Sequence, residues 1–366
     1  TRSDGPSEAP ARHPGESRGP LPNDDPGYRP RSNCRNPVTE LASSSASWPS
    51  IGVMGGGAIG CLYGGWLAKA GAPVTIVGRP IHVDAMRAHG LRVTGRDFDF
   101  QVPVNASTDL SALAHCDLVL FCTKTRDTEN VATELRSFLL PTAAILAFQN
   151  GVDGAERLAS ILPNPVFSAA LVVSCYIEGP GHVHHNGRGD VLLGDWLPTR
   201  GDAAQRSALL ESIVATLRRA SILASLAPDI RLTLWTKLAM NCGYNALSAL
   251  CRARYQRLVT AEPSRVLMRR IVEELVAVGQ GDGVALEFDV VLKQVMDLAA
   301  GFPTAISSTG QDIAKGRPTE IDDLNGYVVR RGRALGVPTP INEALQLMVK
   351  VLEEAPVDPA FFPSRG

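Results

Sequence analysis

The sequence lacks an excess of charge of either sign. Its 36 Lys and Arg and 37 Asp and Glu residues leave a formal net charge of −1 over 366 residues. A chain that binds a polyanion usually carries a basic surface, so this balance predicts a protein without a nucleic-acid partner. The length suggests two domains and a tail.

The sequence also lacks the cysteine spacing of a disulfide framework or a structural metal site. Its seven cysteines are an odd number without a C-x-x-C pair, and most lie in apolar segments. We expect reduced core thiols rather than disulfides or metal ligands. The residues concerned are Cys34, Cys61, Cys116, Cys122, Cys175, Cys242 and Cys251.

Residues 1–48 lack the apolar residues that folding requires, and are rich in Pro, Gly, Ser, Asp and Arg. They have no continuous apolar stretch like that of a signal peptide, and their scattered acids are atypical of a transit peptide. The prediction is a disordered extension over residues 1–48 on a cytoplasmic protein without a membrane partner.

A glycine-rich run follows a short apolar strand that begins at Ile51 and precedes a helical pattern. Glycines at these spacings permit a tight turn, a close backbone approach to a pyrophosphate, and close packing of helix on strand. The helix N-terminus then faces the anion. The run predicts a dinucleotide site formed by Gly55, Gly56, Gly57, Ala58, Ile59 and Gly60.

The next strand, Pro73 to Val77, lacks the Asp or Glu that usually follows it in an NAD site. The chain has Gly78-Arg79-Pro80 there instead. A guanidinium suits the 2′-phosphate of NADP, so Arg79 predicts NADPH as the cofactor. The alternative is an ordinary exposed surface arginine.

Strand and helix patterns alternate up to about residue 228, which predicts an α/β fold with a Rossmann-type, doubly wound parallel sheet. We expect an antiparallel extension of that sheet from Val166, and only helices after Asp229. The predicted domains are residues 49–228, which bind NADP, and residues 229–366, an all-helical substrate and dimerisation domain. The expected elements are strands 117–122, 143–148, 166–173 and 191–193, a helix 128–139, and turns 179–181 and 186–189.

Two polar residues follow buried strands, at the sheet edge where open α/β folds bind ligands. Lys124 could supplement Arg79 near the adenosine phosphate, and Asn150 could hold the nicotinamide side or the substrate. Each has an ordinary alternative as a turn or helix-cap residue.

The segment 232–247 is apolar nearly all round, which predicts a buried helix capped by Asp229. Lys237, Asn241 and Asn245 are exceptions, and their i, i+4, i+8 spacing places them in one row. Burying these groups without partners costs several kcal/mol, so the row must face a ligand cleft or a structural acid. The expected acid is Glu320, in the first turn of a helix that Pro318 and Thr319 prepare.

Histidines also cluster at residues 182–185, but adjacent strand residues point to opposite faces and no Cys, Asp or Glu completes a set nearby. The prediction is no metal. Apolar stripes at 271–278 and 345–352 predict core contacts or contacts of a homodimer.

Taken together, these motifs resemble the ketopantoate reductases (2-dehydropantoate 2-reductases). The resemblance covers the chain from about Ile51 onward. It depends on the glycine run followed by Arg79, on Lys124, on Asn150-Gly151, on the Lys-x3-Asn-x3-Asn row, and on Ser308, which eleven residues separate from Glu320. It implies a Rossmann domain, an all-helical C-terminal domain, and reduction of ketopantoate by NADPH in pantothenate synthesis.

The resemblance also implies roles for single residues. Lys237 matches the family's proton donor, and Asn241, Asn245 and Ser308 match its substrate ligands. Asn150 and Glu320 match residues that contact both cofactor and substrate. Arg79 and Lys124 match positions that face the 2′-phosphate.

The chain departs from the family where Asn-Pro-Leu-Thr-Ala is common, since it has Asn245-Ala246-Leu247-Ser248-Ala249. The substrate, a small anionic 2-keto acid, could therefore be another than ketopantoate. A non-catalytic NADPH-binding regulator is a further alternative, which would not need Lys237 and Glu320.

Overall fold

The computed structural model describes residues 47–197 and 202–354. Most of the predicted extension, residues 1–46, therefore lies outside the described residues. Trp48, at the end of the segment predicted to be disordered, packs against the core. The guanidinium of Arg219 lies 3.9 Å from the centre of its ring.

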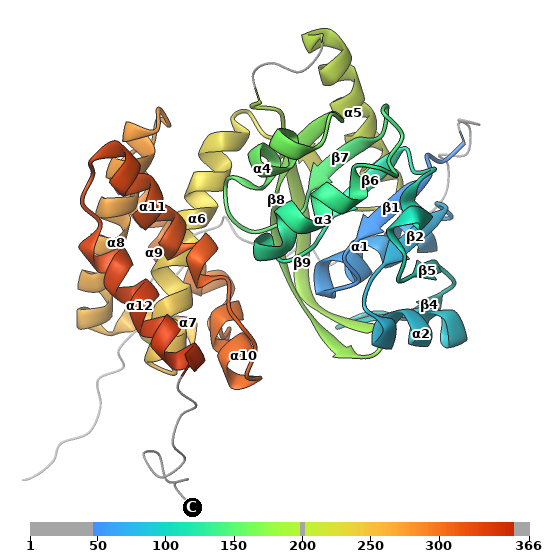
Figure 1. Cartoon of the computed structure of the whole chain (residues 1–366). Helices are drawn as coiled ribbons and strands as arrows, with labels where there is room; N and C mark the ends of the chain where they lie inside the picture. Colours follow the sequence, from blue (N-terminus) through green and yellow to red (C-terminus); the bar gives the residue numbers. More distant parts are fainter. Residues whose placement is uncertain (1–46, 198–201, 355–366) are drawn as a thin grey trace, which may run out of the picture. The chain divides into compact units, whose positions relative to one another are not determined.

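The strands in the described residues form a single ten-stranded sheet (Figure 1). Six of them run parallel in the order β5-β2-β1-β6-β7-β8. This order reverses on either side of β1, as in a Rossmann fold, and confirms the predicted doubly wound sheet. The bounds are β1 Ile51–Met54, β2 Val74–Val77, β3 Leu91–Gly95, β4 Asp99–Val102, β5 Asn105–Ser107, β6 Leu118–Phe121, β7 Ala144–Ala147, β8 Val166–Gly179, β9 His182–Gly194 and β10 Ala224–Leu226.

Both faces of the parallel strands are buried, because successive side chains of a strand point to opposite sides. In β6, Leu118 and Leu120 join one core cluster, while Val119 and Phe121 join another. Helices α1 (Ala58–Lys69), α2 (Pro80–His89) and α5 (Ala203–Arg219) pack in the first cluster, and α3 (Thr128–Leu135) and α4 (Gly154–Ile161) in the second. Helix α3 ends four residues before the predicted Leu139.

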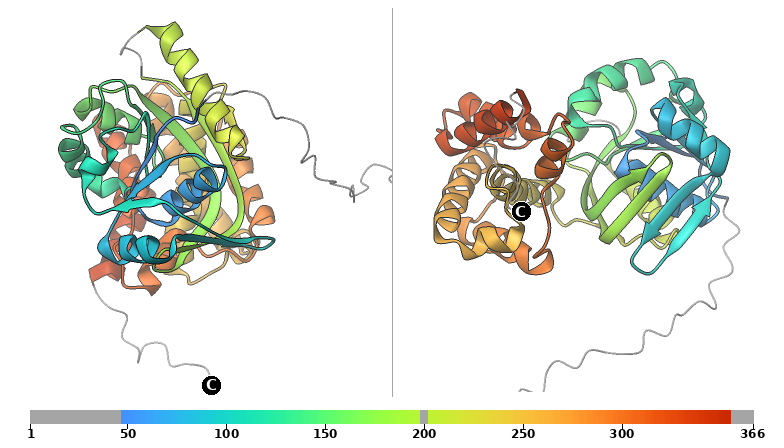
Figure 2. Two further views of the ribbon diagram at one scale, coloured as in Figure 1. Left: turned by 90° about the vertical axis from the view of Figure 1, so that its right-hand side faces the viewer. Right: turned by 90° about the horizontal axis from the view of Figure 1, so that it is seen from below.

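The antiparallel extension is longer than predicted. Strands β8 and β9 pair over most of their length and are seen from two directions in Figure 2. The turn Gly179–Gly181 joins them as expected, but the second predicted turn, at residues 186–189, is wrong. Those residues lie inside β9, where the register shifts, and Arg188 has a positive φ of 59°. Glycines in a strand often mark such bulges rather than turns.

β9 also pairs with β3 and β10, and β3 pairs with β4. Two short 3-10 helices, η1 Leu110–Leu113 and η2 Thr125–Asp127, complete the part of the chain that forms the sheet. We call residues 51–226 the sheet region.

After Asp229 the described chain is helical, as predicted, and we call residues 230–354 the helical region. Asp229 caps α6, since its Oδ1 accepts from the Leu232 N–H at 2.9 Å. A separate apolar core holds these helices together. They are α6 Ile230–Leu250, α7 Tyr255–Thr260, α8 Glu262–Gly281, α9 Phe288–Gly301, α10 Ser308–Ala314, η3 Ile321–Asp323, α11 Asn325–Leu335 and α12 Pro340–Glu354.

The two apolar stripes behave differently. Residues Ile271 and Leu275 of α8 are fully buried in the helical core. In α12, Leu345 and Val349 are buried, while Leu347 is exposed. Contacts of a homodimer stay a prediction.

The described cysteines are free, and most are buried or half-buried. Burial raises the pKa of the Cys61 and Cys175 thiols to about 12, which keeps them protonated. Cys251 is exposed, so the expectation of a core thiol is wrong there. Cys34 lies outside the described residues.

Two further features of the described residues concern membrane-spanning helices and clusters of metal-binding side chains. None of their helices is both long and apolar enough to pass through a bilayer. No three or more of their His, Cys, Asp and Glu side chains gather in a way that could bind a metal ion.

Candidate active site

The glycine-rich loop joins β1 to α1 and has the shape that a dinucleotide needs. Gly55 has a φ of +113°, and a Cβ there would lie 2.8 Å from the Cys122 carbonyl carbon. A Cβ on Gly60 would lie 2.1 Å from the Gly55 carbonyl oxygen, whereas one on Gly57 would meet no atom within 4 Å. The first and third glycines therefore allow tight packing, and the second leaves open space at the N-terminus of α1.

The end of β2 lies against this loop. The backbone N–H groups of Gly55 and Gly56 both donate to the Val77 carbonyl, at 2.9 and 3.0 Å. Arg79 then caps α2, with Pro80 as the first residue of that helix. Its side chain is exposed and has no ion-pair or hydrogen-bond partner among the described residues. The residues present thus fit a dinucleotide, with a free guanidinium just beyond the second strand.

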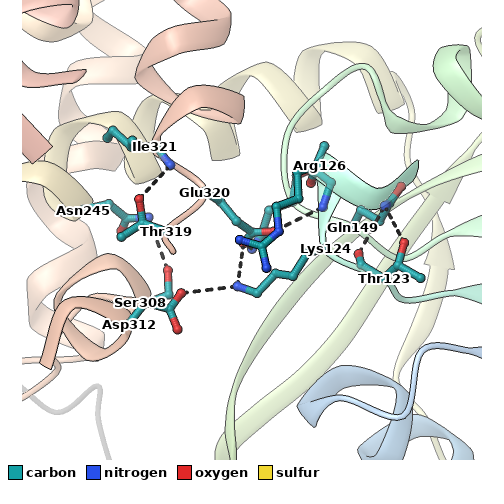
Figure 3. Close-up of polar contacts among 12 residues, drawn as sticks. Thr123, Lys124, Arg126, Gln149, Asn245, Ser308, Asp312, Thr319, Glu320 and Ile321 are labelled. Carbon is teal, nitrogen blue, oxygen red and sulfur yellow. Dashed lines mark hydrogen bonds and ion pairs between the residues drawn. The ribbon is translucent and has the colours of Figure 1, made fainter. Parts of the chain in front are cut away.

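Asn150 follows β7 in a loop that Gln149 fixes. The Gln149 side-chain amide donates to Thr128 Oγ1 at 2.8 Å and to the Thr123 carbonyl at 3.1 Å. Gly151 supplies a positive φ of 94° at the turn. These contacts tie the loops after β6 and β7 together, as Figure 3 shows for Gln149 and Thr123.

Lys237 lies near the middle of α6 and meets this loop. Its ammonium donates to Asn150 Oδ1 at 3.3 Å. Burial lowers the pKa of its amine from 10.5 to about 8, although the charge of Glu320 acts in the opposite direction. Burial and the charge of Glu320 thus act on the pKa of this amine in opposite directions, and burial has the larger effect.

The other two members of the row also lie on α6. Asn245 is buried and donates from Nδ2 to Ser308 Oγ at 3.5 Å. Asn241 is half-buried and has no side-chain hydrogen bond among the described residues. The row therefore provides an ammonium, an amide without a partner and an amide beside a hydroxyl.

The Glu320 carboxylate is the centre of the polar contacts. It accepts from Asn150 Nδ2 at 3.2 Å and from the Thr125 N–H at 3.5 Å. Lys124 Nζ lies 3.3 Å from its Oε2 atom. The prediction that Glu320 lies in the first turn of a helix is wrong, because Glu320 directly precedes the 3-10 helix η3. Pro318 and Thr319 thus introduce a loop rather than an α-helix.

Hydrogen bonds to α12 hold the loop of residues 318–320 in place. The N–H and the hydroxyl of Thr319 donate to Glu353 Oε1 at 2.7 and 2.6 Å. The Ile321 N–H in turn donates to Thr319 Oγ1 at 3.2 Å. The sequence analysis missed Glu353, because nothing in its local pattern relates it to a loop more than thirty residues earlier.

Lys124, in the loop after β6, forms ion pairs with two residues of the helical region. Its ammonium lies between two carboxylates, 3.3 Å from Asp312 Oδ2 and 3.3 Å from Glu320 Oε2 (Figure 3). Burial alone would lower the pKa of Lys124, but these two carboxylates outweigh it and raise the pKa. Asp312 is a second residue that the sequence analysis missed; the available signal was its position one helical turn after Ser308 on α10.

These contacts form one chain of side chains: Lys237, Asn150, Glu320, Lys124 and Asp312. Successive members come alternately from the helical region and the sheet region. Two ammonium groups and two carboxylates sum to zero charge. An open glycine-rich loop and a buried ammonium beside polar side chains are features of one class of protein, the reductases with a Rossmann-type sheet and a helical second region.

The comparisons with known proteins agree with this class. A family model described as "Ketopantoate reductase PanE/ApbA" matches residues 51–198, and the model of its C-terminal part matches residues 229–353. A 2-dehydropantoate 2-reductase of Halobacterium salinarum is 31% identical, over 82% of this chain and 98% of the relative. The chain belongs to the ketopantoate reductase family.

Solved structures give the same result for the fold. A ketopantoate reductase of this family from Ralstonia eutropha JMP134 is 41% identical, with a TM-score of 0.77, over 83% of this chain and 98% of that one. D-mandelate dehydrogenase, solved with NADH and anilino(oxo)acetate, has the same TM-score at 23% identity, over 83% and 98%. The latter shares the fold. Membership of a reductase family supports a nicotinamide cofactor for the glycine-rich loop.

Proposed function

We propose that the protein reduces 2-dehydropantoate (ketopantoate) to (R)-pantoate with NADPH, as a step of pantothenate biosynthesis in the cytoplasm. The observation that carries this proposal is the position of Lys237. It is an ammonium of lowered pKa that contacts Asn150 in a chain of polar side chains between the sheet region and the helical region.

NADPH, when bound, supplies the hydride that the 2-keto carbon receives. The loop Gly55–Gly60 would hold its pyrophosphate at the N-terminus of α1. Arg79 would hold the 2′-phosphate, because a guanidinium can form parallel charged hydrogen bonds to it. This assignment of the cofactor as NADPH rather than NADH rests on this chain's own residues after β2.

Lys237 is the proposed proton donor. When the keto carbon gains a hydride, its oxygen becomes an alkoxide, which an adjacent ammonium neutralises and protonates. With a pKa of about 8 the amine is mostly protonated at pH 7, yet gives up its proton more readily than an ordinary lysine. Glu320 holds Asn150 and its charge favours the protonated amine.

We propose that the substrate binds to the side chains of Asn241, Asn245 and Ser308. The Asn241 amide has no hydrogen-bond partner in the described ranges, and Asn245 and Ser308 offer an amide and a hydroxyl 3.5 Å apart. Such groups can donate to a carboxylate or bind a hydroxyl without changing charge. A small anionic 2-keto acid fits this set.

A reductase of another 2-keto acid is the second candidate. The observation that favours it is the run Asn245-Ala246-Leu247-Ser248-Ala249, which departs from the family's common pattern beside the substrate amides. A non-catalytic NADPH-binding regulator is the third, and the intact Lys237 and Glu320 count against it.

An assay with purified full-length protein separates these functions. We would follow NADPH oxidation with ketopantoate and with a panel of branched and aromatic 2-keto acids. We expect the highest kcat/KM for ketopantoate. A higher value for another acid would favour the second candidate, and NADPH binding without turnover of any acid would favour the regulator.

The role of Lys237 needs its own control. We expect Lys237→Ala to lower turnover by about 10²- to 10⁴-fold, the usual contribution of a general acid, while NADPH binding is retained. Lys293→Ala, at an exposed lysine of α9, is the matched control and should turn over normally. Normal turnover of Lys237→Ala would eliminate the proposed acid.

A further inference from the structure

The charges of two arginines, one from the sheet region and one from the helical region, both act on His82. This imidazole is buried in the first turn of α2, and its Nδ1 accepts from the Gly181 N–H at 3.4 Å. Burial lowers the pKa of His82, and the charges of Arg79 and Arg317 lower it further. Arg79 belongs to the sheet region, whereas Arg317 belongs to the helical region.

The backbone conformation after α10 fixes the position of the Arg317 backbone. Gly316 has a positive φ of 60°, and the Arg317 N–H donates to the Asp312 carbonyl at 2.8 Å. Pro318 follows and restricts the chain. The neighbouring Lys315 places its ammonium 6.0 Å from the ring centre of Tyr176, on β8.

The contacts of Tyr176 and Gly181 connect this end of α10 with α2. Tyr176 lies on β8 near the β8–β9 turn, and that turn includes Gly181. A Cβ on Gly181 would lie 3.1 Å from Ala85 Cβ of α2. The loop that carries Arg317 therefore lies along the same hairpin end that packs on α2, the helix that begins next to Arg79.

Neither guanidinium group has a counter-charge within the part of the chain that the structure describes. The side chains of Arg79 and Arg317 are exposed, and neither has an ion pair or hydrogen bond to any described residue. No carboxylate is among the groups that shift His82. Two exposed cationic groups whose charges both reach the same imidazole can bind one dianionic group together.

We propose that Arg317 acts with Arg79 in binding the 2′-phosphate of NADPH, so that a residue of the helical region takes part in the choice between NADPH and NADH. This inference rests on the proposed function. The two cofactors differ only in that phosphate, and only a group that reaches it can discriminate between them. A guanidinium on either side gives the phosphate more charged donors than Arg79 alone can offer.

The proposal also relates cofactor choice to the substrate site. Arg317 follows α10 directly, and α10 carries Ser308 and Asp312. A phosphate bound by Arg317 would thus hold the same helix that presents a substrate hydroxyl and the carboxylate beside Lys124. NADH, which lacks the phosphate, would leave that helix without this contact.

The test is the affinity of the full-length protein for NADP⁺ and for NAD⁺, measured by calorimetry. We expect Arg317→Met to weaken NADP⁺ binding by about tenfold and to leave NAD⁺ binding unchanged, because the charged hydrogen bonds that it removes go to the phosphate that NAD⁺ lacks. Arg317→Lys should recover part of the loss. Arg270→Met, at an exposed arginine of α8, removes the same charge elsewhere and should change neither affinity.

Three outcomes would overturn the inference: NADP⁺ binding of Arg317→Met equal to wild type, an equal loss for both cofactors, or a wild-type protein without preference for NADP⁺. Failure of the proposed function would look different. In that case the protein would discriminate between the cofactors and lose the discrimination in Arg317→Met, yet reduce no 2-keto acid.

Discussion

The charge of Glu320 should set the upper pH limit of the reaction through Lys237. In the proposed reaction Lys237 donates a proton and must be protonated, so kcat/KM should fall as the pH rises through the pKa of this amine, about 8. Glu320 raises that pKa, and burial lowers it. Replacing Glu320 by Gln removes the raising effect and retains the burial, so the limit should move to lower pH.

The size of the movement follows from the pKa. If the carboxylate contributes about one pKa unit, a common value for an adjacent opposite charge, the limit moves to about pH 7. The protonated fraction at pH 8 then falls from about one half to about one tenth, a fivefold loss. At pH 6 both proteins keep Lys237 mostly protonated, so the effect should nearly vanish there.

The assay is kcat/KM for ketopantoate between pH 5.5 and 9.5 at constant ionic strength, with each profile normalised to its acid plateau. Normalisation removes any loss of substrate or cofactor binding in Glu320→Gln that does not depend on pH. Asp297→Asn, at an exposed acid of α9, is the charge-matched control and should leave the limit in place. An unchanged limit in Glu320→Gln, or one at higher pH, would refute the reasoning.

Three further predictions concern stability and loop geometry. Lys237→Met should raise the free energy of unfolding at pH 7 by about 1–3 kcal/mol in urea titrations, because a lysine of lowered pKa opposes folding at pH values below its unfolded pKa; the gain should shrink between pH 8 and 10.5. Gly60→Ala should abolish NADPH binding in a fluorescence titration, since its Cβ would lie 2.1 Å from the Gly55 carbonyl oxygen. Glu353→Gln should lower kcat/KM about tenfold with little loss in thermal melting, because it weakens two charged hydrogen bonds to Thr319, beside Glu320.

The parts of the fold that follow local patterns were predictable from the sequence. Glycine spacing and apolar periodicity gave the loop between β1 and α1, and an acid before an apolar run gave the Asp229 cap. The row Lys237, Asn241 and Asn245 was visible because polar residues in an otherwise apolar helix must face something polar. These features depend on neighbours within a few turns of the chain.

The features that the sequence did not predict depend on contacts between distant segments. Glu353 acquires its role only when α12 meets the loop of Glu320, and Asp312 pairs with Lys124 only when α10 meets the loop after β6. The spacing of Asp312 from Ser308 indicates a shared helix face, but no local spacing encodes either of these long-range contacts. The glycines at 187 and 189 resemble a turn, because a bulge and a turn require the same backbone freedom. Pairing with β8 across the sheet makes them part of a strand.

The two contacts of Asn150 have a consequence for which side chains that position tolerates. Its oxygen faces the Lys237 ammonium and its NH₂ faces the Glu320 carboxylate, so the amide orientation is fixed by opposite charges at its two ends. An aspartate would set two anions against each other, and a lysine would do the same with two cations. Only a short side chain with both a donor and an acceptor can bond to both neighbours. The dipole of one carboxamide therefore orients the Lys237 ammonium and the Glu320 carboxylate relative to each other.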